Sequence, residues 1–264
     1  MSFFRARPLT DRRALVTGAS SGIGRALAIE LARRGAHLVL LARRADRLAE
    51  VALDISAVGR RVIPIAGDVT DPAVRRRALD AARQELGGLD ILVNNAGVAA
   101  HGRFAEADPN RIRPIFEVNF FAPVELIRES IPLLREGVRP VIVNIGSILG
   151  ERGAPHKSEY SASKFALHGF SEAVRPELAR LGIDVLVVAV GPTQTEHFDA
   201  LLEGTAELPW GDPPRMPSEK AARLIVRGIE RGRHKIVTGW RSRLVMLANR
   251  LCPRLVDRVM SRFG

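Results

Sequence analysis

The 264-residue sequence has one cysteine, Cys252, and this scarcity excludes a class of protein at once. A single thiol forms no intrachain disulfide, so the chain is not a small disulfide-stabilised secreted domain. No apolar run approaches the ~18 residues that a membrane-spanning helix needs. Residues 1–13 lack an apolar core long enough for a secretory signal, and we expect none there. These features favour a reducing compartment, namely the cytoplasm.

Strand-like apolar runs alternate with longer helical stretches along most of the chain. This alternation is typical of βαβ units, in which a parallel sheet carries helices on both faces. We therefore predict one α/β domain of the doubly wound Rossmann type over residues 1–264, with a core at about 12–240 and a helical C-terminal extension at about 240–264. The seven expected strands lie at 13–17, 37–42, 61–66, 89–93, 139–146, 183–190 and 234–238.

A Gly-rich turn, G-A-S-S-G-I-G at 18–24, follows the first expected strand and opens a helix. Gly18 permits a tight turn, Gly22 a close approach of backbone to phosphate, and Gly24 close packing of helix on strand. The N–H groups that begin the helix offer partial positive charge to a pyrophosphate. Strand, turn and helix in this order predict a dinucleotide site, and a loop that only reverses the chain is the alternative. The turn residues Ser20, Ser21 and Ile23 belong to the same predicted site.

Tyr160 and Lys164 stand four residues apart, which places both side chains on one face of a helix. A phenol with a pKa of about 10 exchanges protons poorly near neutrality. A fixed ammonium beside it favours the phenolate and brings that pKa toward working pH. Tyr160 is the only tyrosine, so no other phenol competes for the role. Ser147 closes the expected strand at 139–146, where its hydroxyl is placed to hydrogen-bond a substrate oxygen.

Together these motifs resemble the short-chain dehydrogenase/reductase family over residues 12 to about 240. The turn with Thr17 before it, T-G-A-S-S-G-I-G, is similar to the cofactor motif of that family. Asp68 and Val69 resemble its adenine-pocket pair. The family's fourth strand ends in N-N-A-G, which is found here at 94–97 and includes Asn95, Ala96 and Gly97. The family's catalytic tetrad falls at Asn119, Ser147, Tyr160 and Lys164.

The resemblance implies hydride transfer between a nicotinamide and a carbonyl or alcohol carbon. Tyr160 would be the acid/base, while Lys164 would lower its pKa and hold the nicotinamide ribose. Ser147 would steady the substrate oxygen, and Asn119 would help hold a water that links Lys164 to solvent. The alternative for Asn119 is a structural role inside a helix expected at about 109–136.

The residues after the second expected strand favour NADPH over NADH. That strand ends at Ala42, where an NAD site of this type places a carboxylate for the ribose hydroxyls. Arg43 and Arg44 follow, and a nearby guanidinium accommodates the 2′-phosphate of NADP+ or NADPH. Arg43 is predicted to bind that phosphate in bidentate fashion or to stack on the adenine, and Arg44 belongs to the same predicted site. The alternative is a solvated basic pair that opens the next helix.

The turn after the sixth expected strand, V-G-P-T-Q-T, resembles the family pattern except that Val190 replaces a proline. By resemblance Gly191 belongs to the cofactor site, and Thr193 and Thr195 hydrogen-bond the nicotinamide carboxamide. Residues 196–215 follow as an expected substrate lid. Its apolar side chains indicate a hydrophobic carbonyl substrate, or else anchor the loop to the core: Phe198, Leu201, Leu202 and Trp210.

The net charge of +11 is concentrated at one end, because residues 215–264 hold thirteen Lys and Arg against three Asp and Glu. Residues 254–263 form a predicted basic amphipathic helix, and the stretch before Pro253 repeats its pattern. Three interpretations stay open for 240–264: packing on its own domain or a partner subunit, docking on an anionic membrane, and nucleic-acid binding. The last is disfavoured, because Trp240 and Phe263 are the only aromatic side chains available for base stacking.

The sequence therefore predicts an NADP(H)-dependent oxidoreductase whose small-molecule substrate is a hydrophobic ketone or aldehyde, or the corresponding secondary alcohol. By resemblance it forms a homodimer or homotetramer through helices near 109–136 and 157–180. No metal site is predicted, since the spacing of His101, His156 and His197 fits none, and the first two are expected to line the substrate pocket. The alternatives are an NADPH-binding sensor and a membrane-recruited scaffold without turnover. We expect the protein in the cytoplasm, with peripheral contact at the inner face of a membrane as an option.

Overall fold

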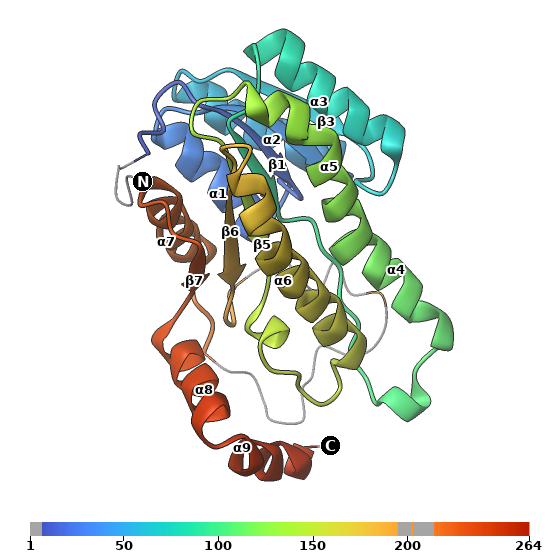
Figure 1. Ribbon diagram of the computed structural model, residues 1–264. Coiled ribbons are helices and arrows are strands. Elements are labelled where there is room, and N and C mark those ends of the chain that lie inside the picture. The colour runs from blue at the N-terminus through green and yellow to red at the C-terminus, as the bar shows by residue number, and fades with distance from the viewer. Residues whose placement is uncertain (1–6, 195–201, 203–213, 264) are drawn as a thin grey trace.

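Figure 1 shows the computed structural model, which describes residues 7–194, 202 and 214–263. Its centre is a seven-stranded sheet in the order β3-β2-β1-β4-β5-β6-β7, with every neighbouring pair parallel. This order confirms the predicted doubly wound Rossmann-type α/β fold. The strands are β1 (Arg13–Thr17), β2 (His37–Ala42), β3 (Val62–Ala66), β4 (Ile91–Asn94), β5 (Val141–Ile145), β6 (Asp184–Ala189) and β7 (Lys235–Val237).

Helices cover both faces of this sheet (Figure 1). Residues of α1, α2 and α7 form one hydrophobic core with the sheet, and residues of α3, α5 and α6 form the other. The helices are α1 (Gly22–Arg33), α2 (Ala45–Ala57), α3 (Pro72–Leu86), α4 (Ile112–Phe116), α5 (Ala122–Arg135), α6 (Ser158–Ala179), α7 (Ser218–Glu230), α8 (Trp240–Leu251) and α9 (Pro253–Met260).

The strands are apolar throughout because successive side chains enter opposite cores. In β1, Ala14 and Val16 pack with α1, α2 and α7, whereas Leu15 between them packs with α3 and α5. All three side chains are fully buried. The carboxyl ends of the strands consequently meet at one edge of a rigid, dry sheet, which is where ligands bind in folds of this type.

The helix expected at about 109–136 is not continuous. A 3₁₀ turn at Pro109–Arg111 leads into α4, a π-helical turn follows at Glu117–Phe121, and α5 comes only after it. Pro123 offers a physical reason, because proline has no N–H and the carbonyl of Asn119 four residues earlier loses its α-helical partner. A π turn re-pairs the backbone around such a gap, and it places Asn119 at the irregular point.

The predicted C-terminal helical extension is present as α8 and α9, which lie at the lower end of the view in Figure 1. Cys252 separates them, and Pro253 occupies the first turn of α9, where its missing N–H costs nothing. Across the described ranges, no helix combines the length and apolar character needed to cross a membrane.

The expected lid lies largely outside the described residues, including Phe198, Leu201 and Trp210. Leu202 is described, and its N–H donates to the carbonyl of Ala99 at 2.8 Å. Its side chain is exposed, so it does not form part of an apolar underside in this structure.

Candidate active site

The Gly-rich turn between β1 and α1 leaves no room for larger residues. Gly18 and Gly22 have positive φ angles of 64° and 51°. A Cβ on Gly24 would lie 2.1 Å from the carbonyl oxygen of Gly18. The N-cap residue Ser21 makes no side-chain cap hydrogen bond, and the first turn of α1 holds no acidic residue. The N–H groups that begin α1 are therefore not capped by a side chain, as an anion-binding helix start requires.

Thr17 at the end of β1 and Asn95 directly after β4 brace this turn. The Thr17 hydroxyl accepts hydrogen bonds from the backbone N–H groups of Asn95 and Ala96, both at 3.0 Å. The Asn95 side-chain amide donates to the carbonyls of Thr17 and Gly18 at 3.0 and 3.2 Å. The N-N-A-G segment thus fixes the position of the Gly-rich turn relative to β4.

Arg44, rather than Arg43 on which the sequence argument rests, is the arginine that turns toward this site. A guanidinium nitrogen of Arg44 lies 3.5 Å from the Ser20 hydroxyl, while Arg43 is exposed. Ala42 ends β2 opposite Ala66 of β3, so no carboxylate stands at either of these strand ends. A cationic group therefore lies between the Gly-rich turn and the end of β2, where the 2′-phosphate of NADPH is predicted.

Ser147, Tyr160 and Lys164 lie together beyond the carboxyl end of β5. The hydroxyls of Ser147 and Tyr160 share a hydrogen bond, and Ser147 also accepts from the N–H of Leu149 at 3.1 Å. The Lys164 ammonium lies 5.7 Å from the centre of the Tyr160 ring and donates to the carbonyl of Ile145 at 3.1 Å. Lys164 is buried, whereas the Tyr160 side chain is half-buried.

The sequence predicts that Lys164 lowers the pKa of Tyr160, and for the protein chain by itself this prediction is wrong. Burial raises the pKa of Tyr160 to about 12, and the hydrogen bond with Ser147 offsets only part of this. Burial also lowers the pKa of Lys164 to about 8, so desolvation weakens the cation that was expected to favour the phenolate. Spacing in the sequence predicts proximity, but desolvation acts on both groups and opposes their charged forms.

Asn119 binds a neighbouring segment rather than its own helix. Its side-chain oxygen accepts from the N–H of Val98 at 2.9 Å, and its amide donates to the carbonyl of Val98 and the hydroxyl of Ser163, also at 2.9 Å. A Cβ on Gly97 would lie 3.2 Å from the Asn119 oxygen and 3.7 Å from the Lys164 nitrogen. Asn119 therefore joins Val98, directly after the N-N-A-G segment, to α6 close to Lys164.

A family model described as short chain dehydrogenase matches residues 12–206 of this chain. The chain belongs to the short-chain dehydrogenase family. The family assignment made from the sequence is thereby confirmed, and the chain is an oxidoreductase-family protein with a fold that holds nicotinamide cofactors in solved relatives.

Proteins similar to this chain carry names that state different activities. A ketoacyl reductase from Nostoc sp., HetN, is 30% identical over 263 residues, covering 97% of this chain and 90% of the relative. An 11-beta-hydroxysteroid dehydrogenase, 1A, from Arabidopsis thaliana is 35% identical over 257 residues, covering 92% and 72%. The names of these two short-chain dehydrogenases indicate different substrates, so similarity alone does not select one for this chain.

Two similar solved structures hold different cofactors, one NADP and the other NAD. A short chain dehydrogenase from Burkholderia cenocepacia in complex with NADP superposes with a TM-score of 0.82 at 27% identity, covering 96% of this chain and 99% of the other. One from Burkholderia phymatum in complex with NAD gives 0.85 at 25% identity, covering 94% and 96%. The shared fold therefore supports a nicotinamide cofactor without deciding between the two.

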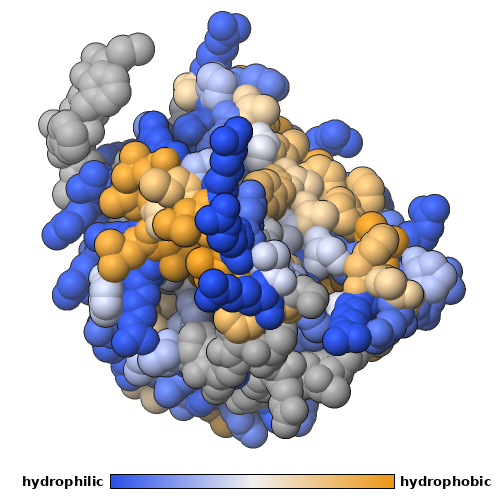
Figure 2. All heavy atoms as spheres, turned by 90° about the horizontal axis from the view of Figure 1, so that it is seen from below, coloured by the Kyte–Doolittle hydropathy of each residue, from blue (hydrophilic) through white to orange (hydrophobic). Residues whose placement is uncertain are grey.

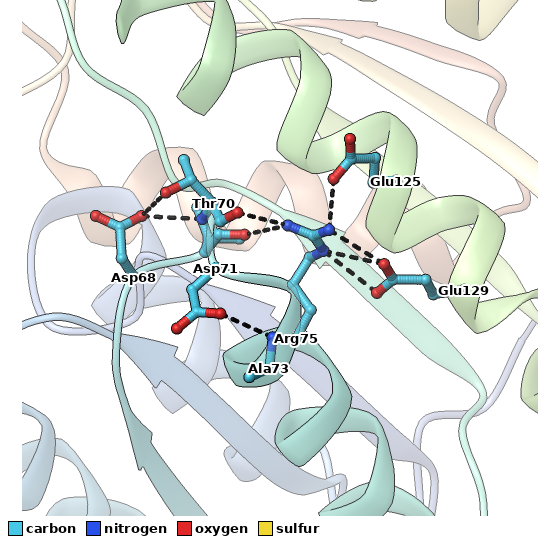
Figure 3. Close-up of polar contacts among 8 residues, drawn as sticks. Asp68, Thr70, Asp71, Ala73, Arg75, Glu125 and Glu129 are labelled. Atoms are coloured by element: carbon cyan, nitrogen blue, oxygen red, sulfur yellow. Dashed lines mark hydrogen bonds and ion pairs between the residues drawn. The ribbon is translucent and has the colours of Figure 1, made fainter.

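Arg75 is a residue of this dehydrogenase that the sequence analysis missed (Figure 3). It is 1% exposed on α3, and it donates to the carbonyls of Val69 and Thr70 at 3.0 Å. Its guanidinium also pairs with Glu125 and Glu129 of α5. Arg75 thus ties the predicted adenine-pocket turn to α5. The available signal was its position next to Val74 and three residues before Ala78, on the apolar face of α3.

Asp68 and Val69 form that turn. The Asp68 carboxylate accepts from the N–H and hydroxyl of Thr70 at 2.9 and 2.8 Å, and Val69 is buried. The carboxylate is therefore engaged in shaping the turn, and the structure places the pair at the end of β3, next to β2 and its arginines.

The segment after β6 is held from the C-terminal side. The N–H of Gly191 donates to the Thr238 hydroxyl at 2.9 Å, and a Cβ on Gly191 would lie 2.2 Å from the Ser242 hydroxyl. The Thr193 hydroxyl donates to the carbonyl of Gly191 at 2.9 Å. Thr195 lies outside the described residues. Thr193 is thus bonded within its own turn, and its predicted contact with a carboxamide stays a prediction.

The histidines expected at the pocket occupy two neighbouring loops. His101 is buried, and the carbonyl of His156 accepts from the N–H of Gly102 at 3.0 Å, which joins the loops before α4 and α6. His197 lies outside the described residues. Nearby, Arg111 makes a buried two-point ion pair with Glu159 at 2.9 and 3.0 Å, fixing the start of α6 directly beside Tyr160.

Proposed function

We propose that this dehydrogenase transfers a hydride between NADPH and a hydrophobic ketone, aldehyde or secondary alcohol, in the cytoplasm. The observation that supports it most is the convergence of Ser147, Tyr160 and Lys164 beyond the sheet edge that also carries the Gly-rich turn. A dinucleotide held on the N-terminus of α1 would extend along this edge from Arg44 toward Tyr160.

The chain's own residues supply binding and proton transfer for this reaction. NADPH, when bound, supplies the hydride. A phenol with a pKa near 12 stays protonated at neutral pH, so Tyr160 is the proton donor to the carbonyl oxygen during reduction. Ser147, already hydrogen-bonded to Tyr160, orients that oxygen. Lys164 then stabilises the phenolate that remains, and proton transfer from solvent restores the phenol.

The preference for NADPH is supported by the charges at the end of β2. A 2′-phosphate placed near Ser20 would meet the Arg44 guanidinium, and charge-assisted hydrogen bonds of this kind contribute about 1.5–3 kcal/mol. Ala42 supplies no carboxylate that would favour the 2′-hydroxyl of NADH. We expect Arg44→Ala to raise the KM for NADPH roughly tenfold to hundredfold while changing the KM for NADH little.

An oligomer built on α4 to α6 is part of the proposal. Phe121 and Phe165 are exposed on these elements, and Phe120 lies edge-on to Phe170 at 6.2 Å between ring centres. Exposed aromatic side chains of this kind are enriched where subunits meet. The cytoplasmic location is supported by Cys252, which is an exposed free thiol.

The test follows NADPH consumption by absorbance over aldehydes and ketones of graded chain length and ring size, with NADH in parallel. Turnover with NADPH that Tyr160→Phe abolishes supports the proposal. Equal rates with NADH would contradict the Arg44 argument and leave the reductase. Tight NADPH binding without turnover on any carbonyl would favour the sensor alternative.

A further inference from the structure

The α8–α9 segment, residues 240–263, carries an unusual share of the exposed apolar surface. Seven of the sixteen large apolar side chains that are exposed among the described residues lie in it. Its buried residues, by contrast, are limited to Ser242. These exposed side chains are Trp240, Leu244, Val245, Leu247, Leu251, Leu255 and Val259.

The apolar residues of α8 form a single stripe. Trp240, Leu244, Leu247 and Leu251 recur at intervals of four, three and four, which places them on one face of a helix. They are 66%, 53%, 51% and 69% exposed. The stripe therefore does not pack on its own domain. This exposure argues against the own-domain half of the packing interpretation and does not bear on packing against a partner subunit.

Arginines border this stripe. Residues 240–263 contain six arginines and one acidic residue, Asp257. Asp257 pairs with Arg152 at 2.6 Å, so the single negative charge of the segment is directed back to the domain. Figure 2 views the molecule from the side where α8 and α9 lie nearest, and it shows hydrophobic side chains gathered among hydrophilic ones.

We propose that the α8–α9 face docks on an anionic lipid surface. Apolar side chains would enter the boundary of headgroups and acyl chains, and the arginines would meet lipid phosphates. Charge complementarity decides against a second copy of the same face, because that contact would bring two sets of six arginines together.

The tail is attached to both sides of the candidate site, so docking also orients it. Ser242 in the first turn of α8 packs against Gly191, and Asp257 of α9 holds Arg152, five residues after Ser147. Tyr160 of α6 and the carboxyl ends of the strands therefore lie on the side of the molecule where α8 and α9 are attached. Docking is measured as binding of the protein to vesicles, so its test does not depend on the proposed reaction.

The first test is co-sedimentation of the full chain with vesicles. Phosphatidylcholine vesicles containing phosphatidylglycerol should pellet the protein, pure phosphatidylcholine vesicles should not, and high salt should release it. Equal binding to both vesicle types, or binding to neither, would overturn the proposal.

Two double variants separate the apolar and charged contributions. Leu244→Ser with Leu251→Ser should lower the vesicle partition coefficient more than tenfold. Its matched control on exposed leucines elsewhere is Leu53→Ser with Leu181→Ser, which should bind like wild type.

Arg250→Gln with Arg258→Gln should lower the partition coefficient about 30-fold. The control here replaces two exposed arginines of α3, Arg76→Gln with Arg83→Gln, and has the same net charge. Equal losses in the tail variant and this control would show a general charge effect and overturn the assignment to α8–α9.

Trp240 reports directly on insertion. The chain has two tryptophans, so Trp210→Phe leaves Trp240 as the single indole. Its emission should shift to shorter wavelength with anionic vesicles and be quenched by brominated acyl chains. An unchanged spectrum, or a blue shift on self-association without lipid in sedimentation equilibrium, would overturn the proposal and assign the face to a protein contact. A blue shift with RNA or DNA alone would assign it to nucleic acid.

Discussion

The candidate active site and the α8–α9 segment place polar and apolar side chains in opposite environments. In the site, polar groups are buried and paired: Thr17 and Asn119 are each 1% exposed, and each holds backbone groups of a neighbouring segment. In α8–α9 the leucines are exposed, and the arginines face outward. Buried hydrogen-bonded groups hold the candidate active site together, whereas exposed side chains give α8–α9 its character.

This difference has an energetic consequence. A buried polar group that loses its partner costs about 1–3 kcal/mol, so the site and the fold are altered together. Exposed residues away from such features usually change stability by no more than about 0.5 kcal/mol. Changes in α8–α9 should therefore alter binding to an external partner and leave the folded domain as it is.

The largest effect is expected at Tyr160. Tyr160→Phe removes the proposed proton donor and should lower kcat by about 10²–10⁴, the usual contribution of a general acid. NADPH binding, measured by fluorescence, should persist. A variant that keeps more than a tenth of the wild-type rate would show that another group donates the proton.

Lys164 should make stability depend on pH. Its folded pKa is about 8 against an ordinary 10.5, so between these values the unfolded chain holds a proton that the folded chain has released. Stability should then rise with pH by about 2–3 kcal/mol from pH 8 to 10, relative to Lys164→Met. The raised pKa of Tyr160 removes stability only above about pH 10.

Urea unfolding at several pH values measures this difference. The control is Lys220→Met, which removes an exposed lysine of α7 and should give no slope against wild type. Parallel stability curves for wild type and Lys164→Met across this window would contradict the buried-lysine account.

Gly24→Ala should damage fold and cofactor site together. Its Cβ would meet the Gly18 carbonyl at 2.1 Å, so the turn must shift, at a cost of about 1–3 kcal/mol, and NADPH should bind more weakly. Gly169→Ala on α6 meets nothing within 4 Å and should instead stabilise by about 0.5–1 kcal/mol. Thermal unfolding and NADPH titration of both variants check this contrast.

The smallest effect on folding is expected in the tail. Leu244→Ser with Leu251→Ser should change the free energy of unfolding by no more than about 1 kcal/mol, about 0.5 kcal/mol for each exposed residue, and leave NADPH binding unchanged. Leu15→Ala in β1, where the side chain is fully buried, should cost about 2–5 kcal/mol. A tail variant as destabilised as the core variant would show that α8 packs on the domain after all.

Local sequence patterns were sufficient to predict much of the secondary structure and several site residues of this protein. Strand–turn–helix order located the Gly-rich turn, and apolar runs located all seven strands to within two residues. Four-residue spacing placed Lys164 beside Tyr160, and helical periodicity identified the amphipathic tail. Each of these features depends on residues close together in the sequence. Such residues determine the local secondary structure and which side chains share one face of a helix.

Contacts between distant segments decided the rest. The pairing of Arg75 with α5, the hold of Asn119 on Val98 and the raised pKa of Tyr160 all depend on residues that only folding brings near. The sequence by itself determined the fold class, the order of the motifs and the amphipathic character of the tail. The tertiary structure decided which groups lose water, because desolvation and exposure belong to the packed molecule and to no segment alone.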